Sequence, residues 1–207
     1  MNYTNAIGII VTTEFMSRIL AFDTWQEQWG NTDRILTEEQ NESVAMQTFS
    51  GFDLTKRIVE AQTDIDGMTA AKRCWNYQKG GLQWYLPCLM ELGVLCAYHD
   101  EINKAMKEIG CPDECLLPTE DSDETWVWSS SEVSQGSSWS VGFSNGSFGS
   151  NSKCGSDMVR AVAAFQPSPS LLTGEAKSND CLHSDEALIN MLRERGYKGE
   201  LTKTLTI

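Results

Sequence analysis

Cysteine and histidine are the residues here that most readily do chemistry, and their spacing forms no recognisable metal site. No two cysteines are arranged as a CxxC pair, and the only histidines are His99 and His183. A structural zinc site needs two close ligand pairs, and Cys111 with Cys115 lacks a second pair. We therefore expect no metal and mostly reduced, buried thiols, as in a bacterial-type cytoplasm. The seven cysteines are Cys74, Cys88, Cys96, Cys111, Cys115, Cys154 and Cys181.

No set of nucleophile, base and acid is visible either. His99 stands beside Asp100 near a helix end, which favours a surface residue over a general base. The run Asp64-Ile65-Asp66-Gly67 resembles a fragment of a calcium loop without its remaining ligands, so it predicts a turn, with a metal as the minor alternative. The acidic run at 120–124 predicts a solvated loop, with weak cation binding as the alternative. The sequence thus predicts no catalytic residue and no cofactor.

Composition excludes several classes of partner. The 207 residues carry a formal net charge of −13, which argues against nucleic acid and against an anionic membrane surface. No stretch approaches membrane-spanning length, and the N-terminus lacks the basic and apolar regions of a signal peptide. Seven tryptophans are many for this length and indicate an irregular core or a binding surface. We expect a protein made in the bacterial cytoplasm and then displayed on a particle such as a virion.

The first hundred residues read as two strands followed by helices. Short apolar runs within residues 6–29 predict an opening pair of strands. Apolar spacing then predicts helices over Asp53–Ala61, with Asp53 as the cap, and over Thr69–Tyr77. Extended residues Trp84-Tyr85-Leu86-Pro87 lead into a helix through Cys96, and a last helix, Asp100–Ile109, ends at Gly110.

The segment from Trp126 to Phe165 is the most informative part of the chain. Its Ser/Gly-rich composition is compatible with a flexible linker. A linker, however, would not alternate large apolar residues with small ones, as Trp139, Val141 and Phe143 do before Asn145-Gly146. This pattern predicts a hairpin from Trp139 to Phe148, with its apolar residues inward and its small residues facing solvent. Residues 159–165 alternate as a closing strand.

The C-terminal part is predicted to be an appendage. The prolines at 167 and 169 end the main domain, which we place at residues 1–165. Residues 166–207 then contain a linker, a helix capped by Ser184 and stopped by Gly196, and a strand over Leu201–Ile207. This segment is too small to fold securely alone, so we expect it to pack on the main domain or on another chain.

Two parts of the sequence resemble a known family. Trp84-Tyr85-Leu86-Pro87 with Glu91 is similar to the W-x-L-P-x-x-x-E signature of C-type-lectin-like domains of the formylglycine-generating-enzyme type. Residues 128–132, 139–146 and 159–162 resemble the C-terminal region of variable proteins from diversity-generating retroelements, found in gut bacteria and their phages. The resemblance covers roughly residues 5–165 and implies an α+β fold, a C-type-lectin-like domain with two or more helices and a small antiparallel sheet.

The resemblance also implies a ligand-binding face whose residues are diversified by mutagenesis of template adenines. Asparagine codons of the AAY type then give serine, glycine, aspartate, cysteine and others, whereas Gln135 and Met158 do not arise in this way. The alternative is that these residue types simply favour turns, although cysteine does not. The predicted variable face comprises Ser140, Gly142, Ser144, Asn145, Ser147, Gly149, Ser150, Asn151, Ser152, Cys154, Gly155 and Asp157.

These observations predict a receptor-binding protein without enzymatic activity. The expected partner is a host-cell surface protein or glycan, and multimerisation would add avidity. A structural alternative is a virion or surface-assembly component that docks through residues 166–207. The cysteine oxidase activity of formylglycine-generating relatives is not carried over, because only Cys154 lies near the position of their catalytic pair.

Overall fold

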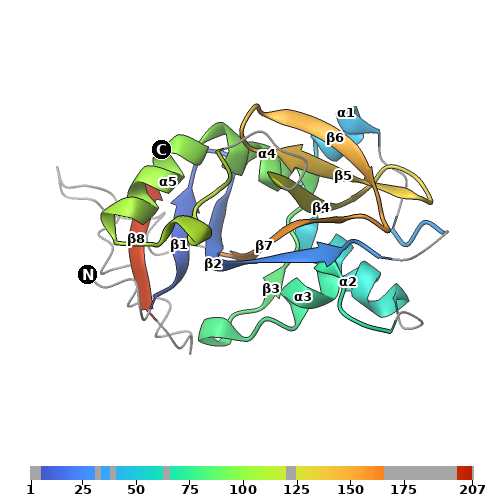
Figure 1. Ribbon diagram of the computed structural model, residues 1–207, viewed down its shortest axis with the longest axis horizontal. Helices are drawn as coiled ribbons and strands as arrows, with labels where there is room; N and C mark the ends of the chain where they lie inside the picture. Colours follow the sequence, from blue (N-terminus) through green and yellow to red (C-terminus); the bar gives the residue numbers. More distant parts are fainter. Residues whose placement is uncertain are drawn as a thin grey trace, which may run out of the picture.

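The computed structural model describes residues 6–30, 34–37, 41–62, 66–119, 125–165 and 200–206. It has a mixed β-sheet with helices on both faces, so the predicted α+β class is confirmed (Figure 1). The strands are β1 (Ala6–Thr12), β2 (Ser17–Gln28), β3 (Trp84–Tyr85), β4 (Trp126–Glu132), β5 (Ser137–Gly142), β6 (Ser147–Ser152), β7 (Ser156–Ala164) and β8 (Glu200–Thr206). The helices are α1 (Glu42–Ala45), α2 (Gly51–Ala61), α3 (Ala70–Trp75), α4 (Leu89–Ala97) and α5 (His99–Glu108), with 3₁₀ turns at Lys79–Gly81 and Asp113–Cys115.

The sheet is larger than predicted and is not wholly antiparallel. Its strand order is β6-β5-β4-β7-β2-β1-β8, and β3 pairs in addition with β7. The pairs β4–β7 and β1–β8 are parallel, which corrects the expectation of a small antiparallel sheet. The difference arises because β7 lies between the N-terminal hairpin of β1 and β2 and the strands β4 to β6, and thereby joins them into one sheet.

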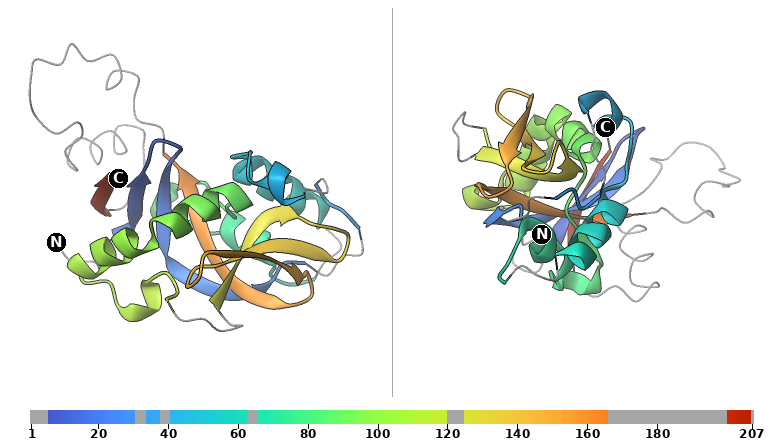
Figure 2. Two further views of the ribbon diagram at one scale, coloured as in Figure 1. Left: turned by 90° about the horizontal axis from the view of Figure 1, so that it is seen from above. Right: turned by 90° about the vertical axis from the view of Figure 1, so that its right-hand side faces the viewer.

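Both faces of the central strands are buried. Along β2, Leu20 and Phe22 enter the apolar cluster that also contains residues of α4 and α5. Ile19 and Ala21 enter the opposite cluster, with residues of α2 and α3. Successive side chains of a strand point to opposite faces, so this alternation places one helical pair on each side of the sheet. Figure 2 shows the two helical layers from further directions.

The helices predicted between residues 53 and 109 are present, with one correction at a cap. Asp53 lies in the first turn of α2, whereas the N-cap residue is Ser50. Gly51, the first residue of the helix, allows a close approach that another residue would block. A Cβ atom at position 51 would lie 2.2 Å from Glu91 Oε2 and 2.8 Å from the Cys88 nitrogen.

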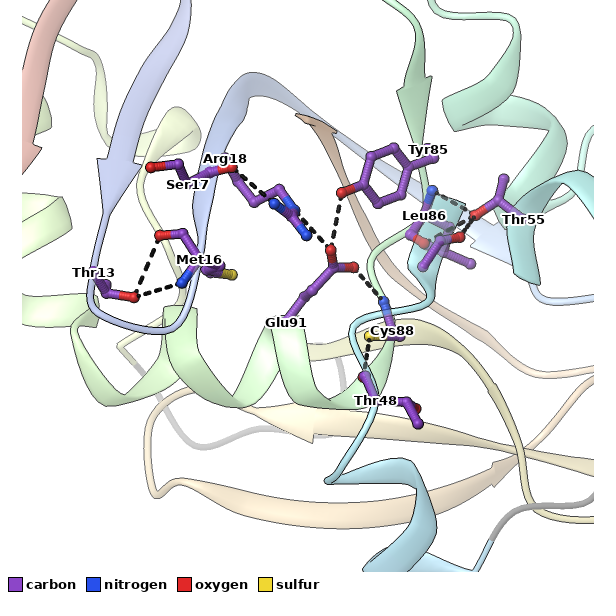
Figure 3. Close-up of polar contacts among 11 residues, drawn as sticks. Thr13, Met16, Ser17, Arg18, Thr48, Thr55, Tyr85, Leu86, Cys88 and Glu91 are labelled. Atoms are coloured by element: carbon purple, nitrogen blue, oxygen red, sulfur yellow. Dashed lines mark hydrogen bonds and ion pairs between the residues drawn. The ribbon is translucent and has the colours of Figure 1, made fainter. Parts of the chain in front are cut away.

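Glu91 explains why the W-x-L-P-x-x-x-E pattern supports the fold. Its buried carboxylate accepts hydrogen bonds from Arg18 Nε at 2.7 Å, the Tyr85 hydroxyl at 2.9 Å and the Cys88 amide at 3.0 Å (Figure 3). These donors come from β2, from β3 and from the start of α4. A single carboxylate thus holds the sheet to the helix, and breaking such a buried network is strongly destabilising.

The C-terminal strand predicted at Leu201–Ile207 is confirmed as β8, which pairs with β1 of the same chain. The helix predicted between Ser184 and Gly196 lies outside the described residues, as does the whole of the predicted linker. The division of the chain at residue 165 stays a prediction, although a strand from beyond it belongs to the same sheet.

Candidate ligand-binding surface

The predicted hairpin is formed by β5 and β6, with a four-residue turn from Phe143 to Gly146. Gly142 pairs with Ser147, and Gly146 takes a left-handed φ of 69°, for which glycine is well suited. The Asn145 side chain accepts a hydrogen bond from the Ser147 amide at 2.9 Å. The turn is longer than the two residues of a tight Asn-Gly reversal because Phe143 is drawn into the core, where it is 1% exposed.

The predicted variable residues divide into three groups by exposure. Ser140, Gly142 and Asp157 are buried, so the expectation that all the small residues face solvent is wrong for these three. The half-buried members are Ser144, Ser147, Gly149, Asn151 and Gly155, and the exposed members are Asn145, Ser150, Ser152 and Cys154.

Cross-strand pairing explains why Ser140 and Gly142 are buried. In an antiparallel pair, directly opposite residues share a face of the sheet. Ser140 lies opposite Trp128 of β4, and Gly142 lies opposite Trp126. The face predicted to be open is therefore covered in part by two tryptophan side chains. Trp139, predicted as an inward anchor, is half-buried and packs against the core cluster.

Trp126 covers the hairpin at two glycines. A Cβ atom at position 149 would lie 2.8 Å from Trp126 Cζ3, and one at position 142 would lie 3.5 Å from Trp126 Cζ2. The ring needs the space that a glycine leaves at 149. This position is therefore not free to change without displacing Trp126.

The remaining candidates lie on both sides of the hairpin. Ser150 pairs with Trp139 and therefore shares its face, where Trp139 and Phe148 pack against the cluster that contains α4 residues. Gly149 and Asn151 lie on the opposite side, together with Trp126. The candidate residues thus surround the outer edge of β6 and its turn and do not form one flat face.

A groove lies where the hairpin turn meets the helices. It has a volume of about 560 Å³, and Ser144 and Asn145 form part of its lining. The opposite wall comes from the α4–α5 junction, where His99, Asp100 and Glu101 line it. His99 Nε2 is 3.3 Å from Asp100 Oδ1. Sequence reasoning placed His99 on the surface but had no signal that the hairpin turn would face it.

The base of the hairpin is fixed by a buried ion pair that the sequence analysis missed. Lys153 Nζ lies 2.5 Å from Glu132 Oε1, and both side chains are 0% exposed. The Glu132 carboxylate also accepts hydrogen bonds from the backbone amides of Leu36 and Thr37. Lys153 Nζ lies 4.7 Å from the centre of the Trp29 ring. The signal in the sequence was one lysine within a run of small polar residues.

Two further buried charged residues, Asp157 and Arg160, lie on β7. Asn151 Nδ2 donates to Asp157 Oδ2 at 2.7 Å, and burial raises the pKa of the Asp157 carboxyl. The Arg160 guanidinium donates to four backbone carbonyls, and burial lowers its pKa to about 10. Arg160 therefore ties β7 to β2 and to the chain around Cys115, which makes it a structural residue.

No protein-family model and no curated protein matches the sequence. Among solved structures, the chain is similar to a fimbrial protein from Bacteroides ovatus, with 15% sequence identity and a TM-score of 0.47. The match covers 72% of this chain and 36% of that one. The chain therefore spans little more than a third of the length of that protein.

Cys74, Cys88, Cys96 and Cys111 are free thiols. Cys74, Cys88, Cys96, Cys111 and Cys115 are buried as predicted, Cys154 is exposed, and Cys181 lies outside the described residues. Burial raises the pKa of Cys88 and of Cys111 to about 12 each, so these thiols are poor nucleophiles at neutral pH.

Within the described ranges, no three His, Cys, Asp or Glu side chains are grouped so that they could hold a metal ion. The acidic run at 120–124 and the pair Asp64-Ile65 lie outside those ranges, as does His183.

None of the helices in the described part of the chain is long and apolar enough to cross a membrane.

Proposed function

We propose that this chain is a ligand-binding protein with a C-type-lectin-like fold, whose contact residues are diversified by a retroelement. Its partner is a protein or glycan on a host-cell surface. The contact surface is the outer edge of the β5–β6 hairpin with its turn and the loop that follows β6.

One observation carries the proposal: the residues that hold the fold together, here called the framework, are not those exposed at the outer edge of the hairpin. The framework is held by buried charged side chains that are not among the proposed contact residues: Glu91 with Arg18, and Glu132 with Lys153. The small residues at the outer edge, by contrast, leave their side chains wholly or partly in water. Exposed substitutions that lose no buried contact usually change stability by no more than about 0.5 kcal/mol. Such an edge can change its chemistry while the fold stays intact.

Burial narrows the set of contact residues. Ser140, Gly142 and Asp157 are too buried to meet a partner directly, and Gly149 is constrained by Trp126. The proposed contact residues are the exposed Asn145, Ser150, Ser152 and Cys154, with the half-buried Ser144, Ser147, Asn151 and Gly155 around them.

The genetic part of the proposal is tested by sequencing the DNA around the gene. We expect a reverse transcriptase gene and a near-copy of the codons for residues 126–165, mismatched only at adenines. If neither is present, diversification is rejected, although the binding surface is still open to test.

The binding part is tested with two libraries on the full chain, displayed on yeast. One randomises residues 145, 150, 152 and 154, and the matched control randomises 140, 142, 149 and 157. We expect the first to keep its folded fraction and to yield binders to purified host-surface proteins or glycans. We expect the control to lose its folded fraction. Equal loss in both libraries would contradict the proposed division between surface and framework.

The structural alternative, assembly into a larger body through residues 166–207, has weaker support. The strand β8 of that segment pairs with β1 of its own chain. It is thus already engaged within the domain, and this favours a role for the tail in completing the sheet.

A further inference from the structure

The groove between the hairpin turn and the α4–α5 junction has two unlike walls. On one side are Ser144 and Asn145 of the turn, which belong to the proposed contact surface. On the other are Asp100 and Glu101, which belong to the helical framework. A ligand in this groove would contact the proposed contact residues Ser144 and Asn145 and the framework residues Asp100 and Glu101 at the same time.

The inner part of the groove is apolar because a helical glycine makes room for an aromatic ring. Phe148 and Ala97 line the groove, and Phe148 packs against the apolar cluster beneath it. A Cβ atom at Gly93 of α4 would lie 3.4 Å from Phe148 Cζ and 3.2 Å from Met46 Cε. The glycine therefore allows the ring to lie close to the helix, which provides a surface for a chain of methylene groups.

The charge of the groove is negative. Two carboxylates line it, and no lysine or arginine is among its described lining residues; His99, which also lines it, can become cationic. Lys104 lies beyond Asp100, in the neighbouring pocket. The Asp100 side chain is 87% exposed, so its carboxylate is available to a ligand, although His99 Nε2 lies 3.3 Å away. A net charge of −13 adds a general attraction for cations.

The turn contributes a further polar group. Ser144 Oγ is buried and has no hydrogen-bond partner among the described residues, although Ser144 lines the groove. A buried hydroxyl without a partner is unfavourable, and a donor group that entered nearby would relieve it after a rotation of the side chain. An ammonium or guanidinium group has donors and no acceptor, which suits this hydroxyl and the two carboxylates.

We propose that this groove receives a lysine or arginine side chain presented by the partner, which is therefore a protein with a basic surface segment. The methylene stem lies on Phe148 and Ala97, and the charged end reaches Asp100 and Glu101. The turn residues Ser144 and Asn145 adjust the fit. The inference rests on the proposed function, and it selects a protein over a glycan as the partner class.

The test uses the full chain and blocked peptides in an NMR titration of backbone amides. The peptides are acetyl-Gly-Lys-Gly-amide, its arginine analogue, and a matched neutral peptide with Nε-acetyl-lysine. We expect the two basic peptides to shift the amides of Gly93, Ala97, Asn145 and Gly146 and the acetylated peptide to bind about tenfold more weakly, because one charge contact with each carboxylate is lost.

Variants separate the carboxylates from general electrostatics. The double variant Asp100→Asn with Glu101→Gln should weaken the lysine peptide about tenfold. The control Glu60→Gln removes an exposed carboxylate on α2 and should leave the affinity unchanged. Equal binding of the lysine and acetyl-lysine peptides, no shift of groove amides, or equal loss in the control would each overturn the proposal.

The outcome is distinguishable from that of the proposed function. If methyl glycosides shift the groove amides and the lysine peptide does not, the partner is not a basic protein. The proposal of a binding surface at the hairpin would still hold. If the basic peptides bind but no reverse transcriptase or template repeat is found, the groove stands and diversification fails.

Discussion

At the scale of single residues, burial decides which of the small hairpin residues can change. Ser150 and Gly149 are neighbours on β6 with opposite surroundings. Ser150 is exposed, whereas Gly149 lies under the Trp126 ring. Their types alone, serine and glycine, give no indication of this difference, because both are common in turns.

Gly149→Ala is therefore expected to destabilise the protein. The new methyl would lie 2.8 Å from Trp126 Cζ3, so the ring must move, and overpacking of this kind costs about 1–3 kcal/mol. The matched variant Ser150→Ala should change the free energy of unfolding by no more than about 0.5 kcal/mol. Urea denaturation of both variants measures the difference. Equal stability would show that Trp126 does not constrain position 149.

Asp157→Asn is expected to change the pH dependence of stability. Burial raises the pKa of the Asp157 carboxyl in the folded state, so the contribution of this group is fully present below its unfolded pKa of about 4. It is lost as the pH rises through the raised folded value. The asparagine variant should therefore gain stability relative to the parent between acid and neutral pH.

Urea denaturation from pH 3 to pH 7 measures this gain. The control is Asp53→Asn, on an exposed residue of α2. If the free energies of unfolding of Asp157→Asn and the parent differ by the same amount from pH 3 to pH 7, the raised pKa of Asp157 is contradicted.

At the scale of elements, the hairpin depends on an ion pair at its base. Lys153 follows β6, and Glu132 ends β4, so the pair joins the two ends of the β4–β6 unit and holds residues 36 and 37 against it. The separation between framework and surface depends on this pair, because it fixes where β6 ends without using any exposed side chain.

Lys153→Met should cost about 3–5 kcal/mol, because it leaves the buried Glu132 carboxylate without its cation. The double variant with Glu132→Gln should recover part of that loss, since the unpaired charge is removed as well. A double-mutant cycle by urea denaturation measures the coupling. If the two single losses are small and add up in the double variant, the pair does not hold the hairpin.

The helices and strands themselves were largely predictable from the sequence, whereas the contacts between elements distant in the sequence were not. Apolar spacing identified α2 to α5, the opening strands and the hairpin, because each leaves a local periodic pattern. The pattern also assigned Trp139 inward, where it packs against the core cluster, and Ser140 and Gly142 outward. It failed for Ser140 and Gly142 because Trp128 and Trp126, on β4, lie opposite them in the sheet. Pairing between strands distant in sequence leaves no local signal.

The same reason explains what was missed at the candidate site. The groove joins a turn near residue 145 to a helix junction near residue 100, and the ion pair joins position 132 to position 153. Asn145-Gly146 predicted that the chain reverses, yet nothing in it indicates which surface the turn faces. Only the packing of β5 against α4 decides that.

At the scale of the whole molecule, the C-terminal strand completes the sheet. The strand β1 is buried on both faces, and β8 pairs with its outer side. Without β8, the backbone donors and acceptors on that side of β1 would have no strand partner, and such an edge invites pairing with other chains.

A chain that ends at Phe165 should therefore be less stable and should self-associate. Each backbone hydrogen bond contributes about 1 kcal/mol, so the loss of the β1–β8 ladder adds up to several kcal/mol. Urea denaturation measures the loss, and light scattering after size-exclusion chromatography measures association. A synthetic peptide of residues 198–207 added in trans should restore stability in proportion to its concentration, whereas a scrambled peptide should not. A truncated chain that stays monomeric and as stable as the parent would mean that β8 is dispensable to the sheet. The segment 166–207 would then be available for docking elsewhere. The alternative in which this segment docks the protein into a larger assembly would then be favoured.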